Sequence, residues 1–244
     1  MVSIQVLTLS TFALFAASAA DVATEIRTVP LAPEQRADIF MARKMYREAI
    51  DKYREAPDSA VISNKLGIAF HQLQDLGAAR RSYQRAVKMQ PSYSEAVNNL
   101  GTIFYAQKDY RRAIKLYKSA LRINPQSASI YSNLGTAYFA RKDYRRASEA
   151  YQKALSIDPE VFDHHSHYGV LLQDHNVADR ARFHYYLART YAKAGMTDRA
   201  LEYIRKALEE GFEERKKFLE EPEFTTLRVN AEFQQLMAYA PRKL

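Results

Sequence analysis

Histidines gather in one stretch of the sequence, where they raise the question of a metal site. Five of the six lie within residues 164–184. They are His164, His165, His167, His175 and His184. Adjacent residues point in different directions on a helix, whereas a metal site needs three or four ligands that converge on one point. The other interpretations are a polar, partly buried helix start and a pH-sensitive patch. We assign no metal ligand.

No other arrangement of residues points to catalysis. The sequence contains no glycine-rich phosphate loop, no HExxH pattern and no GxSxG pattern. The paired carboxylates Glu209/Glu210 and Glu220/Glu221 lie in charged runs without an apolar pocket around them. Cysteine is absent, which excludes disulfides, thiolate metal sites and a cysteine nucleophile but leaves the compartment open. We therefore expect a protein that is not an enzyme and that needs no cofactor.

Glycine and proline recur at a fixed distance along the chain. Both series have a step of 34 residues: Gly67, Gly101, Gly135 and Gly169, and Pro57, Pro91, Pro125 and Pro159. A fixed period of this length predicts a solenoid of stacked repeat units. Because a solenoid builds an elongated surface, the first functional hypothesis is recognition of another molecule.

Each period reads as two helices. Apolar residues recur three and four apart in the first helix, as in Val97, Leu100 and Phe104, and again in the second, from Tyr110 to Leu121. The glycines lie inside the first helix, where glycine costs about 1 kcal/mol relative to alanine. We therefore expect each glycine to allow close packing against the large tyrosine of the second helix. Those tyrosines are Tyr83, Tyr117 and Tyr151.

Small residues and helix caps occupy constant positions in the same units. Alanines occur at two offsets in the second helix, Ala79, Ala113 and Ala147 and then Ala86, Ala120 and Ala154. Asp109 and Asp143 precede second helices and are predicted to cap them.

Together these columns resemble the tetratricopeptide repeat (TPR) family, a 34-residue helix–turn–helix pattern. The resemblance is complete over residues 59–159 and weaker on both sides. Ala49, Tyr53 and Ala56 fit but lie 30 residues before the next set, so the second helix of that unit should be one turn short. The resemblance implies an all-α fold: a right-handed α-solenoid of about five stacked helix–turn–helix units with a C-terminal helical cap. It also implies a non-catalytic protein–protein interaction scaffold.

The predicted array spans residues 33–210 and is followed by a cap over residues 211–244. The cap resembles the closing segment of many bacterial members, with Glu221-Pro222-Glu223-Phe224 as its most distinctive part. Residues 178–194 allow two readings. Counted from Gly169 they form a second helix with Ala181, Tyr185 and Ala188. Counted from residues 197–208 they form a first helix.

First helices line an inner groove in this family, so the resemblance implies a partner-binding surface. Its residues here are Asn64, Ile68, His71, Asn98, Thr102, Tyr105, Ser132, Thr136 and Phe139. Short hydrogen-bonding residues beside rings suit an extended or helical peptide of a protein partner. The alternative is an ordinary helix face with partial packing. The Lys/Arg clamp of the chaperone-binding members is absent, because its columns hold Asn64, Ile68, Ser129 and Asn133.

Positive charge is confined to one segment. Residues 78–122 hold ten Lys and Arg against two acidic residues, which accounts for the whole formal net charge of +8. The family places most of these on the outer, convex wall. The basic patch assigned there comprises Arg80, Arg81, Arg111, Arg112, Lys115 and Lys118. It is either a docking site for an acidic protein or an anionic lipid or polymer, or a solvated, solubilising face. Without a recognition motif, nucleic acid is not an expected partner.

Residues 1–20 carry no charged side chain. An apolar stretch, Ile4–Phe15, is followed by the small residues Ala16–Ala20, which predicts an export signal cut after Ala19 or Ala20. No Lys or Arg precedes the apolar stretch, and an uncleaved membrane anchor is the alternative. We therefore expect an exported bacterial protein, periplasmic or secreted, in which residues 21–32 are a short exposed linker.

Overall fold

The computed structural model describes residues 31–162 and 177–238, and these contain helices and no strand. The predicted signal at residues 1–20 and residues 21–30 of the predicted linker lie outside this range. Residues 33 onward form one compact unit. Its first eight helices are α1 (Pro33–Ala42), α2 (Tyr46–Glu55), α3 (Ala60–Gln72), α4 (Leu76–Met89), α5 (Ser94–Ala106), α6 (Tyr110–Ile123), α7 (Ala128–Ala140) and α8 (Tyr144–Ile157). The remaining elements are α9 (Val177–Lys193), α10 (Thr197–Glu209), α11 (Lys216–Glu220), the 3-10 helix η1 (Pro222–Leu227) and α12 (Ala231–Ala238).

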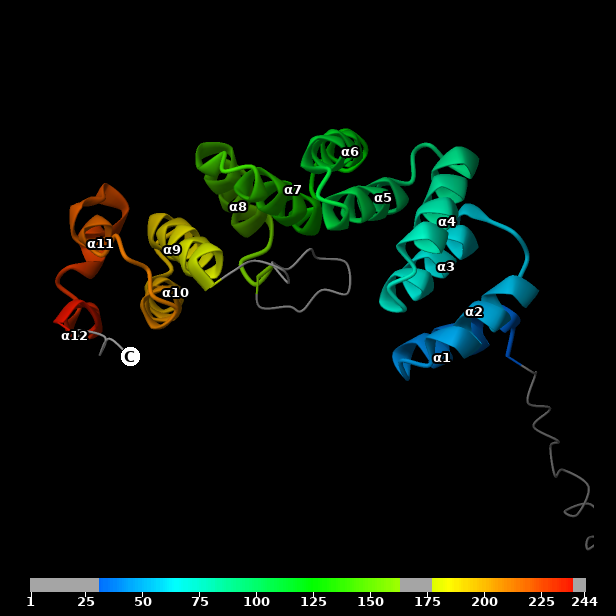
Figure 1. The fold of residues 1–244 in the computed structure, drawn as a ribbon, viewed down its shortest axis with the longest axis horizontal. Helices are drawn as coiled ribbons and strands as arrows, with labels where there is room; N and C mark the ends of the chain where they lie inside the picture. Colours follow the sequence, from blue (N-terminus) through cyan, green and yellow to red (C-terminus); the bar gives the residue numbers. More distant parts are fainter. Residues whose placement is uncertain (1–30, 163–176, 239–244) are drawn as a thin grey trace, which may run out of the picture. The chain divides into compact units, whose positions relative to one another are not determined.

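Helices pack as consecutive pairs. Within the described residues α1 pairs with α2, α3 with α4, α5 with α6, α7 with α8 and α9 with α10, and each second helix also packs on the first helix of the next described pair. Figure 1 traces these pairs along the chain. The predicted all-α array of stacked helix pairs is confirmed. Because α9 pairs with α10, residues 178–194 act as a first helix. The reading from Gly169 rests on residues outside the described range.

Each repeated glycine lies directly against a tyrosine ring, as the spacing predicts. A Cβ atom built on Gly67 would lie 2.4 Å from Cε1 of Tyr83, and one built on Gly101 would lie 2.6 Å from Cε1 of Tyr117. Both tyrosine side chains are buried. Any larger residue at these glycines would therefore have to displace the ring that fills the unit's core.

The last pair reaches the same packing with different residues. Ala188 occupies the glycine position of α9, and the residue at the tyrosine position of α10 is Ile204. Both are fully buried. An added methyl group on the first helix is thus matched by a smaller side chain on the second, which keeps the packed volume similar.

The turn inside each pair has a constant conformation. The residue seven positions after the glycine column has a positive φ in all five pairs: Lys44, Gln74, Lys108, Lys142 and Gly195. The following helix then begins with an aspartate cap in three cases. Asp75, Asp109 and Asp143 each accept a hydrogen bond from the backbone N–H three residues later. The predicted caps at Asp109 and Asp143 are confirmed.

The first unit is shorter than the others, as its spacing predicts. Helix α2 has 10 residues, whereas α4, α6 and α8 each have 14. Its core still uses the family columns, since Ala37, Ala49 and Tyr53 are buried.

Elements α11, η1 and α12 follow the last pair and do not continue the repeat. Phe218, Phe224, Leu227 and Phe233 are buried there. Helix α9 contacts η1, and α10 contacts α12. These segments thus cover the last pair, which is what a cap of the array requires. No helix within the described ranges is both long and apolar enough to cross a membrane.

Candidate functional site

The nine predicted groove residues lie on α3, α5 and α7, but most of them are not open to solvent. Seven are buried, namely Asn64, Ile68, Asn98, Thr102, Tyr105, Thr136 and Phe139. His71 and Ser132 are partly exposed. The expectation of an open surface is therefore wrong for the seven buried residues, although a role in binding stays a prediction for this helix face. The reason is that the next pair packs directly over these columns.

Buried amides form a ladder across three successive first helices. Asn99 of α5 donates from Nδ2 to Oδ1 of Asn64 in α3 at 3.0 Å, and Asn98 donates to Oδ1 of Asn99 at 3.2 Å. Asn133 of α7 donates to Oδ1 of Asn98 at 2.9 Å. The amide of Asn64 also donates to the Glu95 carboxylate at 3.0 Å. The predicted hydrogen-bonding side chains therefore bind one another and set the register between units.

The two predicted aromatic groove residues pack against the turn of their own unit. The rings of Tyr105 and Tyr110 are 5.2 Å apart between centroids. Phe139 contacts Tyr144 at 5.3 Å and the α9 residues Phe183 and Tyr186 at 5.5 and 6.0 Å. Truncating either ring would therefore remove core packing, not only contacts to a partner.

A neighbouring column on the same face is the accessible one. It lies six residues before the glycine position, one helical turn from the predicted Asn64 column. Val61 is 40% exposed. The other members, Glu95, Ser129 and Arg182, are partly exposed. We call these four residues the open column. Sequence reasoning missed it because spacing shows which residues share a helix face but not what covers them.

Charged residues close the first-helix face at the N-terminal end. Nζ of Lys65 lies 2.8 Å from Oε1 of Glu34 and 2.7 Å from Oδ2 of Asp38. Burial alone would lower the pKa of Lys65, but the hydrogen bonds from Asp38 and Glu34 outweigh it and raise the pKa. Tyr53 donates to Asp38 at 2.6 Å. These acids neutralise Lys65 within the protein.

At the other end, α9 holds a segment of the cap. Arg189 donates from Nε and Nη2 to Oε1 of Glu223 at 2.9 and 2.7 Å, and its Nε lies 3.2 Å from Oε2 of Glu221. Burial works against the charge of Arg189, but Glu223 and Glu221 prevail and raise its pKa. Phe224 packs with its ring centroid 6.2 Å from that of Tyr185. Helix α9 therefore binds an acidic and an aromatic side chain that are adjacent in sequence.

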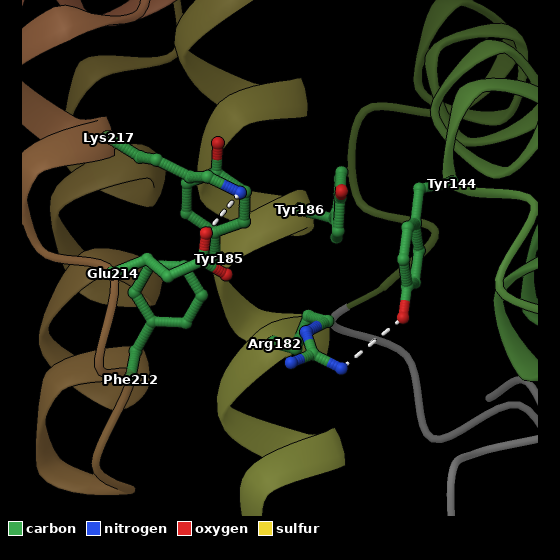
Figure 2. A pocket seen from close by; sticks show the side chains of 7 residues that line it. All are labelled: Tyr144, Arg182, Tyr185, Tyr186, Phe212, Glu214 and Lys217. Atoms are coloured by element: carbon green, nitrogen blue, oxygen red, sulfur yellow. Dashed lines mark hydrogen bonds and ion pairs between the residues drawn. The ribbon is translucent and has the colours of Figure 1, made fainter.

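A pocket of about 260 Å³ opens on the N-terminal half of α9. Figure 2 shows its lining: Tyr144, Arg182, Tyr185, Tyr186, Phe212, Glu214 and Lys217, which we call the C-terminal pocket. Tyr144 and Tyr186 stack at 4.8 Å with an interplanar angle of 15°. Tyr185 and Phe212 stack at 4.5 Å and 9°. Two ring pairs thus form the walls.

The polar groups of the C-terminal pocket leave one positive charge in excess. Nη1 of Arg182 donates to the hydroxyl of Tyr144 at 3.3 Å, and this bond is the first cause of a raised pKa at Arg182. Nζ of Lys217 lies 2.7 Å from Glu214 and 5.7 Å from the centroid of Tyr185. Lys217 is therefore paired with a carboxylate, whereas the printed hydrogen-bond partner of Arg182 is a neutral phenol.

Most of the histidine cluster cannot be placed. His164, His165, His167 and His175 lie outside the described residues. Nδ1 of His184 lies 2.8 Å from Oε2 of Glu210, and burial lowers its pKa against the opposing effect of Glu210. Among the residues that the structure describes, no group of three or more His, Cys, Asp or Glu side chains could hold a metal ion.

The basic patch is fully exposed. Its six residues, Arg80, Arg81, Arg111, Arg112, Lys115 and Lys118, lie on α4 and α6 and are all exposed. These two helices carry nine cationic residues and no acidic one, whereas α2 and α10 each carry three of either sign. Arg112 pairs with Asp109 at 3.3 Å, and Nζ of Lys118 lies 5.7 Å from the ring centroid of Tyr138.

Comparison with known families agrees with this architecture. Three models of the tetratricopeptide repeat match the chain, at residues 41–94 and 64–128, at residues 104–168 and at residues 185–216. The chain is a tetratricopeptide repeat protein. The last match covers most of α9 and all of α10, which agrees with their pairing as one TPR unit.

Solved TPR structures share the fold. The crystal structure of MamA is 24% identical, with a TM-score of 0.50 over 71% of this chain and 93% of that chain. MamA from Desulfovibrio magneticus RS-1 is 21% identical, with a TM-score of 0.50 over 72% of this chain and 92% of that chain. YrrB, described as a TPR protein with an unusual peptide-binding site, is 24% identical with a TM-score of 0.46 over 52% and 67%. These likenesses show the fold alone. No curated protein matches the sequence.

Proposed function

We propose that this TPR protein is a non-catalytic scaffold that binds a peptide or partner protein along the first-helix face of its array. Membership of the TPR family carries the proposal, because stacked helix pairs build an extended surface for recognition. The size of the C-terminal pocket supports it. Pockets for drug-sized small molecules measure about 300–1,000 Å³, so a volume of about 260 Å³ suits side chains of a partner.

The binding surface we propose is the open column with its partly exposed neighbours His71 and Ser132. The buried groove residues support it from beneath. The amide ladder holds α3, α5 and α7 in register, so that Val61, Glu95 and Ser129 recur at a constant interval along the array. A rigid row of this kind suits an extended segment that crosses several units.

Site-specific photocrosslinking in the source cell tests this proposal. A photoreactive residue at Ser129, in the open column, should capture a partner. The same residue at Ser156, which is exposed on the second helix α8, is the matched control. A product at Ser129 that is absent at Ser156 supports binding on the first-helix face. Equal products at both positions, or none at Ser129, would reject it.

A second candidate function is docking of the α4–α6 face on an anionic lipid or polymer surface. The charge pattern favours it, since all nine cations of α4 and α6 are exposed and neither helix carries an acid. Like charges three or four residues apart, such as Arg111 and Lys115, destabilise a helix. An anionic surface would remove that repulsion.

Vesicle binding discriminates the two candidates. Replacing Arg111, Arg112, Lys115 and Lys118 with Gln should weaken sedimentation with anionic vesicles and flatten its salt dependence. Arg145 and Arg146, an exposed pair on α8, provide a matched control when replaced with Gln. Weak, salt-insensitive binding by the parent protein would instead identify a solvated face.

We further propose that residues 1–20 direct export to the periplasm or medium. The uncharged apolar stretch and the small residues at Ala16–Ala20 support this proposal. Amino-terminal sequencing of the protein from its source cell should give a chain that begins at Ala20 or Asp21. A chain that still carries the apolar stretch and fractionates with membranes would favour the anchor instead.

A further inference from the structure

The C-terminal pocket lies on the helix that already binds a segment of this chain. Arg182 is seven residues before Arg189. Seven residues span about two turns of an α-helix, so the two arginines lie on the same side of α9. Tyr185 lies between them in sequence. It contacts the ring of Phe224 on the side of the cap, and it also lines the pocket (Figure 2).

The occupied side of α9 shows what this helix recognises. Arg189 holds the carboxylate of Glu223 through two hydrogen bonds, and the adjacent Phe224 is fully buried among rings. The segment is short, since Glu221-Pro222-Glu223-Phe224 supplies both carboxylates and the ring. An arginine beside a tyrosine therefore binds an acidic residue followed by an aromatic one.

The pocket side repeats these groups around an open volume. Arg182 provides the cation, Tyr185 and Tyr186 provide ring surfaces, and the paired Lys217 and Glu214 lie at the cap side. The net charge of the lining is +1, so one carboxylate balances it. A doubly charged anion would not be balanced and would face Glu214.

We propose that the C-terminal pocket binds an acidic residue and the adjacent aromatic residue of a partner protein segment. The carboxylate pairs with Arg182, and the ring enters the space that Arg182, Tyr185 and Tyr186 surround in Figure 2. This inference rests on the proposed protein-binding function and adds the chemistry of one contact. Arg182 belongs to the open column, so the pocket lies at the C-terminal end of the proposed binding surface.

A peptide that copies the chain's own segment tests the inference. The probe is acetyl-Glu-Pro-Glu-Phe-amide, titrated into the whole protein and followed by amide chemical shifts. We expect saturable binding with shifts at the pocket residues. Arg182→Gln and Tyr186→Leu should each weaken binding by at least fivefold. Arg180→Gln changes an exposed arginine of the same helix that pairs with Glu210, and it should change binding by less than twofold.

Two altered probes separate the charge from the ring. The peptide with Gln in place of both Glu residues, and the peptide with Ala in place of Phe, should each bind at least fivefold more weakly. Parent-like binding by Arg182→Gln, or no saturation up to millimolar peptide, overturns the inference. Shifts confined to Arg189 and Phe224 would mean displacement of the native segment, and they overturn it as well.

The outcomes also separate this inference from the proposed function. Partner capture at Ser129 without peptide binding at the pocket would reject the pocket chemistry and keep the scaffold. Peptide binding without partner capture at Ser129 would keep the pocket and reject the extended surface. Thermal melting of each variant verifies that it is folded.

Discussion

A pair of residues, glycine and tyrosine, decides how closely the two helices of a unit approach. The sequence predicts this contact because glycine inside a helix is unfavourable and so needs a packing reason. The contact of Gly101 with the Tyr117 ring meets that expectation. Ala188 and Ile204 show that the requirement is for a combined volume and not for glycine itself.

Gly101→Ala should therefore destabilise the protein by about 1–3 kcal/mol, because the new methyl group overpacks the contact. In a Tyr117→Ile background the same change should cost much less, or stabilise, since alanine favours helix by about 1 kcal/mol over glycine. Urea unfolding of the four proteins in this cycle measures the coupling. Equal effects of Gly101→Ala in both backgrounds would contradict the contact.

His71 links stability to pH. Burial lowers the pKa of His71 below its ordinary value of 6.5, so the folded protein favours the neutral imidazole. The unfolded chain then binds a proton more readily, and stability falls as the pH drops below 6.5 towards the folded pKa. Above 6.5 the contribution is complete.

His71→Gln should remove this part of the pH dependence. The loss of stability between about pH 7 and pH 5 should become smaller than in the parent protein. Gln72→Asn, a neutral change at the next, partly exposed residue, should leave the slope unchanged. Chemical unfolding at several pH values makes the measurement. A steeper slope in His71→Gln would show that His71 is stabilised in its charged form.

The turns between paired helices follow one design that the sequence conceals. Three of the five positive-φ positions are lysines and one is a glutamine, residues that do not signal a left-handed conformation. Only Gly195 has the expected type. The helices themselves were predictable, because apolar spacing and aspartate caps mark them, but the turn conformation was not. A left-handed residue other than glycine costs about 1–2 kcal/mol.

Lys142→Gly should consequently stabilise the protein by about 0.5–1 kcal/mol, since the relief of strain exceeds the added entropy of the unfolded chain. Lys153→Gly, an exposed position inside α8, is the control and should destabilise by about 1 kcal/mol. Melting temperatures of the two variants should move in opposite directions. A lower melting temperature for Lys142→Gly would contradict the assigned turn.

At the scale of the whole molecule, the order of the units was predictable and the accessible surface was not. The period of 34 residues predicts the array, and the short first unit follows from the spacing of Ala37 and Gly67. The C-terminal pocket, however, joins Tyr144, three residues of α9 and three residues after α10. The last three follow no period, so no spacing in the sequence brings them together.

Because each unit contacts only its neighbours, damage to the cap should remain local. Phe224→Ala removes a fully buried ring that packs on Phe218 and Tyr185, and it should cost about 3–5 kcal/mol in the last unit. Hydrogen exchange should speed up in α9 and α10 and stay near parent rates in α3–α6. Uniform loss of protection would indicate a single cooperative fold.

The amide ladder makes whole units interchangeable during evolution. Asn99 and Asn133 are 34 residues apart. Removal of residues 93–126 would place Asn133 where Asn99 now meets Asn64. A gene that loses such a block would still encode a closed ladder, whereas loss of one residue more or fewer would leave buried amides without partners, each at a cost of about 1–3 kcal/mol. The ladder therefore favours lineages that lengthen or shorten the array by complete units.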